Sequence, residues 1–214
     1  MAAVVASARR RRSEMIEETR ARLIAAGRRA FAAHGYAAAS MDELTAEAGL
    51  TRGALYHHFG DKKGLLQAVV EQIDAEMSVR LDAVTARAAT PWQGFLDQSV
   101  AYIEMALEPE IQRIMLRDGP AVLGDPAQWP SQNACLAATT RSLRALVEDG
   151  TLRPVDPEAA ARLLNGAALT AALWTAAAEQ PEAVLRKAVE GFLLLASGLR
   201  RPEVEQGRAG QGGA

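Results

Sequence analysis

Residues 40–63 read SMDELTAEAGLTRGALYHHFGDKK and predict two short helices joined by a glycine turn. Ser40 and Glu43 form a capping box, which satisfies two of the free amides at a helix start. Apolar or small residues then recur at helical spacing as far as Ala48, so the first helix has one inward face. Gly49 ends this helix, because glycine takes the left-handed conformation without steric cost.

The second helix begins after its N-cap, Thr51, and has two different faces. Leu55 and Phe59 share one side, which predicts packing against a core. The opposite side carries, in place of the Glu and Lys of a typical surface, Gly53, Tyr56, His57 and the flanking Arg52. A glycine inside a helix costs up to about 1 kcal/mol relative to alanine. This face therefore indicates the close approach of a large partner, for which a DNA backbone or base edge fits.

The next helix starts beside this face, with Asp61 as its cap. Lys62 and Lys63 therefore lie at a helix N-terminus, where free amides and the helix dipole already favour a phosphate. The candidate DNA contacts are Ser40, Thr51, Arg52, Gly53, Ala54, Tyr56, His57 and Lys62. We expect Arg52 to bind a guanine edge and Lys62 and Tyr56 to contact the DNA backbone. The alternative is that Arg52 pairs with a nearby carboxylate and reads no base.

This region resembles the N-terminal DNA-binding domain of the TetR family of bacterial transcriptional regulators. The match covers roughly residues 19–66 and includes Phe31 and Gly35 at the end of a leading helix, the A-E-A-G turn at 46–49 and the L-Y-H-H-F run at 55–59. The resemblance implies a helix-turn-helix head that binds double-stranded DNA. It also implies a C-terminal domain that forms a homodimer and binds a small molecule.

The charge distribution agrees with a DNA-binding head. The whole chain of 214 residues has a net charge of −2, which by itself argues against a nucleic-acid partner. Residues 1–64, however, carry 11 Lys and Arg against 7 Asp and Glu, whereas the remainder carries 13 against 19. This asymmetry places the basic footprint at one end. Charges scattered over a solvated surface are the alternative.

The rest of the sequence predicts an all-α fold with two domains. We expect a disordered basic tail over 1–13, a helix-turn-helix DNA-binding domain over 14–64, a helical effector-binding and dimerisation domain over 65–200, and a disordered tail over 201–214. The leading helix should run from Glu14 to His34, with Ile16 on its inward stripe. The arginine run at 9–12 could follow a phosphate backbone or remain a solvated tail, and both interpretations stay open.

Two C-terminal helices predict a dimer interface. Residues 159–178 contain hardly any charge and are apolar around the whole circumference, which is typical of a helix buried on every side. The final helix adds an apolar stripe of Val189, Phe192, Leu193 and Ala196. Two helices from each chain would form a four-helix interface, an arrangement that the resemblance also implies. The alternative is an ordinary monomeric core.

Bulky residues in the C-terminal domain are candidate ligand contacts. They are Tyr102, Met105, Met115, Trp129 and Trp174. Aromatic and methionine side chains suit an adaptable, mainly apolar pocket and therefore a hydrophobic effector. Each of them is more often core filler than a ligand contact.

No pattern in the sequence supports an enzyme or a metal site. His57 and His58 are adjacent and cannot form the i, i+4 pair of a helical zinc site, and no cofactor or catalytic residue is expected. The one cysteine, Cys135, is expected to be an ordinary buried residue. No apolar run is long enough to span a membrane, so we expect a cytoplasmic transcriptional regulator, a repressor released by its effector. The alternative is a helical ligand-binding or interaction protein in which the helix-turn-helix is only structural.

Overall fold

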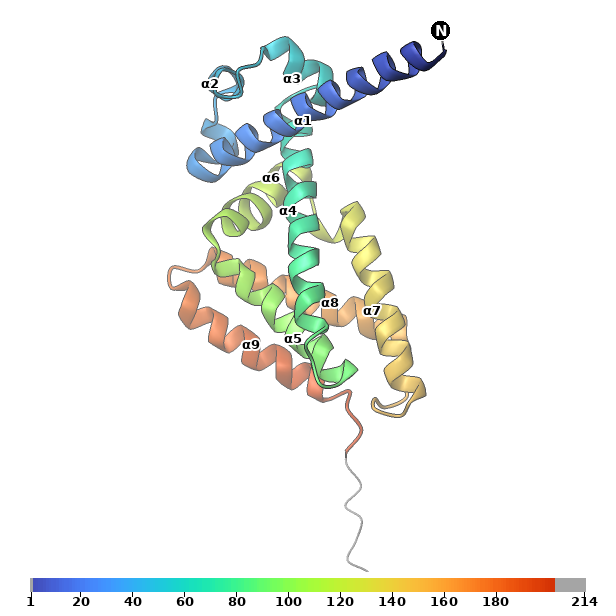
Figure 1. Ribbon diagram of the computed structural model, residues 1–214. Helices are drawn as coiled ribbons and strands as arrows, with labels where there is room; N and C mark the ends of the chain where they lie inside the picture. The colour runs from blue at the N-terminus through green and yellow to red at the C-terminus, as the bar shows by residue number, and fades with distance from the viewer. Residues whose placement is uncertain (1, 203–214) are drawn as a thin grey trace, which may run out of the picture.

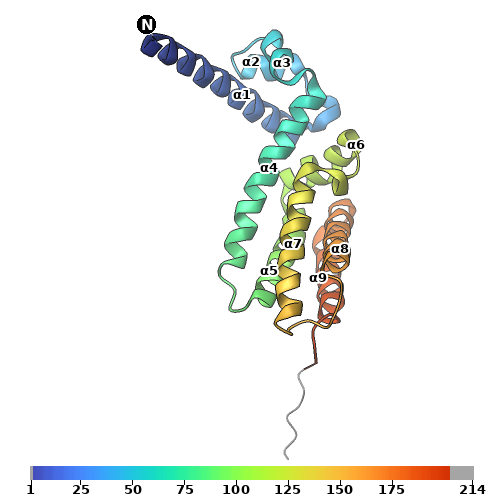
Figure 2. The ribbon, with the colours of Figure 1, turned by 90° about the vertical axis from the view of Figure 1, so that its right-hand side faces the viewer.

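The computed structural model describes residues 2–202, and the side chains of residues 11–202. A head at one end is formed by α1 (Ala2–Ala38), α2 (Met41–Glu47) and α3 (Arg52–Phe59). Helix α4 (Lys62–Thr85) starts in the head and runs along the body (Figures 1 and 2). The expected C-terminal tail lies mostly outside the described residues.

The body consists of helices around α5 and α8. They are α5 (Pro91–Glu104), η1 (Met105–Leu107), η2 (Ile111–Asp118, a π-helix), α6 (Gly119–Leu123), η3 (Pro126–Gln128), α7 (Pro130–Glu148), α8 (Pro157–Ala177) and α9 (Pro181–Ser197). Within residues 2–202 the extended structure is limited to an isolated bridge between Leu152 and Arg200. The all-α prediction is confirmed.

The three predicted N-cap residues of the head each accept a hydrogen bond, but among the described residues the Glu43 side chain makes no return bond to the Ser40 amide, so the predicted capping box is only half formed. The Ser40 hydroxyl accepts a hydrogen bond from the Glu43 amide at 3.4 Å, and the Thr51 hydroxyl accepts one from the Ala54 amide at 3.2 Å. The Asp61 carboxylate accepts from the Gly64 amide at 2.7 Å and starts α4. These bonds fix the ends of α2, α3 and α4 by satisfying amides that a helix start leaves free.

Helix α1 differs from the prediction at both ends. It begins at Ala2, in a segment expected to be a disordered tail, since alanine and arginine are strong helix formers and simply continue the helix. Ile16 is 43% exposed and does not belong to the buried stripe. Gly35 interrupts the helix with φ 76° and ψ 166°, as expected, but a short helical segment follows it to Ala38.

Two hydrophobic cores stabilise the molecule. One joins the head to α4 and to η1 and η2, with Leu23, Phe31, Leu65 and Ile114 fully buried. The other fills the space among α5, α7, α8 and α9. Because the first core crosses from the head into the body, the head is packed onto the body instead of hanging from a linker.

Gly64 makes the close approach of α3 and α4 possible. A Cβ atom at Gly64 would lie 2.0 Å from the Phe59 carbonyl oxygen, a contact that no side chain can make. The glycine therefore fixes the angle at which α4 leaves the head.

Candidate DNA interface and ligand site

The outer face of α3 presents polar and aromatic side chains to solvent. Leu55 is fully buried, whereas Thr51, Arg52, Gly53 and His57 are exposed and Tyr56 is 48% exposed. Ala54 is partly exposed at the edge of this face. The face is therefore available to a partner, and its side chains are of the kinds that contact bases and phosphates.

Gly53 has no structural reason to be glycine in the free protein. A Cβ at this position would meet only the Thr51 hydroxyl, at 3.7 Å, which is an ordinary contact. The residue has helical backbone geometry within α3. The absent side chain therefore leaves room on the outer face, where a DNA backbone could approach.

Arg52 already has partners on the surface of the head. Its guanidinium lies 3.2 Å from the Asp42 carboxylate, and both side chains are more than half exposed. The pKa of Arg52 is raised, first by a hydrogen bond with Tyr56 and then by the charge of Asp42. An exposed ion pair of this kind contributes little to stability, so it can be exchanged for a base contact at small cost.

Lys62 lies against the end of α1 instead of extending freely into solvent. Its ammonium group donates to the Ala37 carbonyl oxygen at 3.3 Å and lies 4.8 Å from the centre of the Tyr36 ring. Burial lowers the pKa of Lys62. The ammonium has three donors, so a phosphate contact is compatible with the bond to Ala37.

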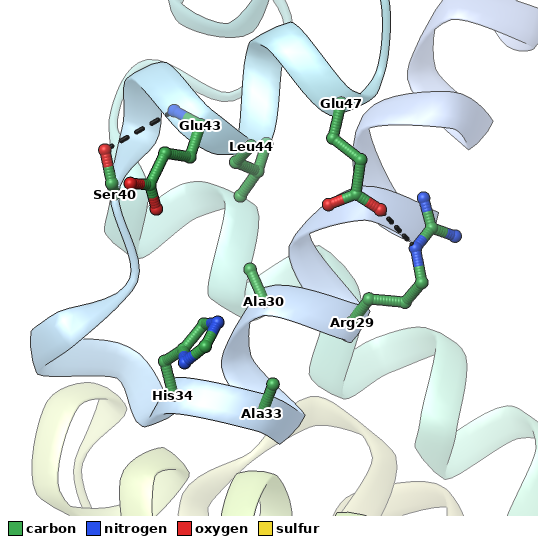
Figure 3. A pocket seen from close by; sticks show the side chains of 8 residues that line it. All are labelled: Arg29, Ala30, Ala33, His34, Ser40, Glu43, Leu44 and Glu47. Carbon is green, nitrogen blue, oxygen red and sulfur yellow. Dashed lines mark hydrogen bonds and ion pairs between the residues drawn. The ribbon is translucent and has the colours of Figure 1, made fainter.

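Ser40 lies at the rim of a small hollow between α1 and α2. Figure 3 shows its cap bond to Glu43 on one side and the ion pair between Arg29 and Glu47, 2.6 Å long, on the other. The hollow has a volume of about 170 Å³, below the usual range for small-molecule sites. It is not a candidate effector site, but the Ser40 hydroxyl still has a proton to donate to a phosphate.

In the body, four of the five candidate ligand residues lie in or against one hydrophobic core. Met105 and Met115 are buried in the core that joins head and body, and Tyr102 and Trp129 pack against the same core. Trp174 is 52% exposed on α8 and is not among them. The sequence could not exclude it, because the all-round apolar α8 gave no sign of which face is outward.

Polar side chains that the sequence analysis missed lie beside Tyr102. Asp74 on α4 and Cys135 on α7 are close enough to Tyr102 for their charges to raise its pKa, although burial is the main cause. The Asn165 side-chain amide of α8 donates to the Cys135 sulfur at 3.7 Å and accepts from the Thr139 hydroxyl at 3.3 Å. We call Asp74, Tyr102, Cys135, Thr139 and Asn165 the polar cluster.

Cys135 was expected to be buried, but it is exposed. Burial of the sulfur atom nevertheless raises the pKa of the thiol, with the charge of Asp74 as a smaller cause. The residue is therefore exposed but its thiol is poorly ionised, which makes it a weak nucleophile. The prediction failed because α7 meets the core with only part of its length.

Trp129 has a buried indole nitrogen with no acceptor among the described residues. Its ring lies against Gly119, where a Cβ would be 2.8 Å from Cη2 of the indole, so glycine is needed to seat the ring. A buried donor without a partner costs free energy. A ligand oxygen could accept this hydrogen bond.

Charged contacts connect the head to the body. The Arg28 guanidinium of α1 donates two hydrogen bonds to Glu110, at 2.7 and 2.8 Å, and a third to Glu76 of α4 at 2.7 Å. The Tyr36 amide donates to the Asp118 carboxylate at 2.7 Å. At its other side, η2 is held to α8 because the Arg117 guanidinium donates to the Ala176 carbonyl oxygen. Helix η2 thus contacts both the head and α8.

The outer faces of α8 and α9 expose large apolar side chains. Leu163 is 75% exposed, Leu194 73% and Leu195 66%. Phe192 and Ala196, which we expected at an interface, are buried in the body's own core at 3% and 0%. The predicted stripe is apolar, but it faces the protein's own core and not a partner. Both sides of α9 are apolar, so only the packing distinguishes the inward side from the outward one.

Gly166 and Gly191 lie in these two helices and have open space around them. A Cβ at either position would have no atom within 4 Å. Mid-helix glycines reduce helix stability, and none of the described residues lies close enough to require them. Small residues beside exposed leucines allow another helix to approach closely.

The described part of the chain has neither a membrane-spanning helix nor a metal-binding cluster. No helix in that part is long and apolar enough to cross a bilayer. Within the same residues no group of three or more His, Cys, Asp or Glu could hold a metal ion.

A three-helix head with an exposed reading helix, packed on an all-helical body, defines a helix-turn-helix DNA-binding regulator. The family model described as "Bacterial regulatory proteins, tetR family" matches residues 23–69. The model described as "Tetracyclin repressor-like, C-terminal domain" matches residues 92–199. The chain therefore belongs to the TetR family of bacterial regulatory proteins.

Similar proteins include transcriptional regulators. A solved TetR-family regulator from Pectobacterium atrosepticum is 51% identical, with a TM-score of 0.82 over 88% of this chain and 97% of that one. The HTH-type transcriptional repressor AcnR of Corynebacterium glutamicum is 31% identical over 137 residues, which are 63% of this chain and 69% of that protein. A TetC protein encoded by a transposon in Escherichia coli is 26% identical over 158 residues, 72% of this chain and 78% of that protein. The chain is thus a transcriptional regulator and not an enzyme.

Proposed function

We propose that the protein is a homodimeric repressor that binds a pseudo-palindromic operator and is released from it by a small, largely apolar effector. The observation that carries DNA binding is the outer face of α3, where Arg52, Gly53, Tyr56 and His57 are exposed while Leu55 holds the helix to the core. A cytoplasmic location follows from a role on DNA. The similarity to a named repressor supports repression as the direction of regulation.

In this proposal each α3 lies in a major groove, and two heads bind half-sites about one helical turn apart. Arg52 leaves Asp42 and donates to a guanine, whereas Lys62, Tyr56 and Ser40 contact phosphates. Thr51, Ala54 and His57 complete the contact surface. The dimer forms through the exposed leucines of α8 and α9, with Trp174 at the same surface.

Release would follow from the contacts of η2. The effector would bind among Tyr102, Met105, Met115 and Trp129, all at the core that η2 shares with the head. An effector that binds preferentially to a conformer with a shifted η2 would move the head, because the contacts of Arg28 and Asp118 connect η2 to α1. The spacing of the two reading helices would then no longer match the two half-sites. Such coupling is typically worth about 1 to 3 kcal/mol.

The test is fluorescence anisotropy with DNA from upstream of the protein's own gene and with random duplex, across a salt series. Arg52→Ala should reduce the ratio of specific to non-specific binding roughly tenfold or more. Lys62→Ala should weaken both duplexes alike and lower the salt slope by about one unit per lost contact. Arg80→Ala is the matched control, because Arg80 also forms an exposed ion pair, with Glu108 of the body. If the wild type and every variant bound the upstream DNA and the random duplex with the same affinity, the helix-turn-helix would be only structural.

A further inference from the structure

The net positive charge of the DNA-binding end comes from one short run of arginines. Residues 1–64 carry 11 Lys and Arg against 7 Asp and Glu. Four of the 11 are the consecutive arginines at 9–12, so residues 13–64 carry 7 against 7 and are neutral. Affinity for DNA depends largely on cations that neutralise phosphates. The arginine run therefore supplies the charge that the rest of the head lacks.

Most other cations of the head are engaged within the protein. Those that hydrogen-bond to a carboxylate or to a backbone carbonyl oxygen are Arg22, Arg28, Arg29, Arg52 and Lys62. The Arg20 guanidinium lies 5.0 Å from the centre of the Phe59 ring, and Lys63 is exposed. Each engaged cation must give up or share a protein contact to bind a phosphate, which reduces what it adds to affinity.

Helix α1 carries the arginine run out of the head. The helix begins at Ala2, residues 11–18 are all exposed, and the first buried side chain among the described ones is Leu23. We call residues 2–18 the α1 overhang. Figures 1 and 2 show it projecting past α3 at the end of the molecule opposite to α9. Most helical stability in proteins comes from packing, so a partner outside the chain is the expected source of it here.

The overhang has the length needed to meet the DNA backbone beside α3. Arg20 contacts Phe59, the last residue of α3. At a rise of about 1.5 Å per residue, Arg12 lies about 12 Å further along α1. The major groove that α3 would occupy is also about 12 Å wide and has phosphates along both edges. The arginine run is therefore at the distance of the phosphates at the edge of that groove.

The run also has two different sides. At about 100° per residue, Arg12 lies within about 20° of Leu23, which is fully buried against the head, and position 9 lies about 60° from Arg12. The other two arginines fall within about 60° of Glu14. The three glutamates that follow the run lie about 120 to 160° from Arg12; they are Glu14, Glu17 and Glu18. Positions 9 and 12 thus belong to the side of α1 that faces the head, away from these carboxylates.

We propose that the α1 overhang is a second DNA-binding element, in which Arg9 and Arg12 bind phosphates at the edge of the groove that α3 enters. The inference rests on the proposed function in that it takes α3 to be the reading helix. Phosphate contacts carry no sequence information. The overhang therefore adds affinity and salt dependence and leaves the choice of operator to α3. Arg10 and Arg11, on the side of the glutamates, contribute less.

The experiment compares two double variants that remove the same charge from the same run. Arg9→Gln/Arg12→Gln changes the side that faces the head, and Arg10→Gln/Arg11→Gln is the matched control. Glutamine is a good helix former, so both variants should keep the helical circular dichroism of the wild type. Fluorescence anisotropy of the full-length protein then measures binding to its upstream DNA and to a random duplex across a salt series.

The two variants should differ. Arg9→Gln/Arg12→Gln should weaken binding to both duplexes by the same factor and lower the salt slope by about two units per head. The ratio of specific to non-specific binding should keep its wild-type value, and the control should lower the salt slope clearly less. Equal reductions in the two variants would overturn the assignment to one side of the helix. Wild-type salt slopes in both variants would overturn the whole proposal.

The same measurements separate this inference from the proposed function. A wild type that binds its upstream DNA no better than random duplex would count against operator binding, whereas a smaller salt slope of Arg9→Gln/Arg12→Gln on random duplex would still support the overhang. A wild type that distinguishes the two duplexes, with unchanged slopes in both variants, would refute the inference alone. Vesicles containing phosphatidylglycerol test another anionic surface. Vesicle binding that depends on Arg9 and Arg12 while DNA binding does not would assign the run to membranes and overturn the proposal.

Discussion

At Gly53, an alanine should improve the helix and obstruct the DNA. The Cβ has space in the free protein, so Gly53→Ala should raise the free energy of unfolding by up to about 1 kcal/mol. The same methyl group would project from the reading face and should weaken operator binding. Chemical denaturation and anisotropy on the same sample measure the two effects. A variant that gains stability and keeps full operator affinity would show that DNA does not approach the backbone here.

At Asp74, removal of the charge should stabilise the free protein. Because burial raises the pKa of Asp74 above its ordinary value, the neutral acid is favoured in the folded state and the ionised form is disfavoured. The cost is thus present near neutral pH and vanishes below the unfolded pKa of about 3.8. Asp74→Asn should unfold at a higher temperature than the wild type at pH 7, and the difference should shrink as the pH falls through the raised pKa. A destabilised variant at pH 7 would contradict this.

At the scale of single elements, the contact between α1 and the body depends on Arg28. This side chain is 23% exposed and binds two carboxylates, whereas the neighbouring Arg29 is 59% exposed and binds one. Arg28→Gln should lower the free energy of unfolding by roughly 1 to 3 kcal/mol, the range for hydrogen bonds to charged groups. Arg29→Gln should change it by less than about 1 kcal/mol. Similar losses in both variants would show that the two ion pairs of Arg28 do not hold α1 to the body.

The same contact predicts an acid dependence. The Arg28 hydrogen bond lowers the pKa of Glu76 below its ordinary value, so Glu76 contributes stability above its unfolded pKa of about 4.3. This contribution should be lost as the pH falls through the folded pKa. Thermal unfolding from pH 7 to pH 3 should show a smaller loss in Glu76→Gln than in the wild type. Parallel curves would exclude a role for Glu76 in the acid transition.

At the scale of the whole molecule, the exposed leucines predict the dimer. Leu163→Glu or Leu194→Glu should convert the dimer to a monomer and weaken operator binding with it, because both side chains are outside the protein's own core. Val79→Glu is the matched control, since Val79 is 71% exposed and lies on α4, outside the two helices of the expected interface. Light scattering coupled to gel filtration measures the mass of each variant. A monomeric wild type at micromolar concentration would refute the interface.

A charged residue at Phe192 should have a different effect from one at Leu163 or Leu194. It is 3% exposed and packs within the body, so Phe192→Glu should unfold the domain instead of separating two intact subunits. Loss of helical circular dichroism distinguishes this outcome from simple dissociation.

The sequence by itself determined the helices and the head. Caps such as Ser40, Thr51 and Asp61 and the turn at Gly49 act within a few residues, and local spacing is enough to define them. The outward face of α3 also followed from the sequence, because its polar residues and its buried Leu55 alternate with helical periodicity.

Tertiary structure alone decided which side of an apolar helix is covered and which distant side chains meet. Phe192 faces inward and Leu194 outward in a helix that is apolar on both sides, so periodicity cannot separate them. Asp74, Tyr102, Cys135 and Asn165 lie on four different helices. Their meeting depends on helix packing angles, which arise from contacts between elements far apart in the chain. Asp74 was for that reason absent from the predicted ligand residues.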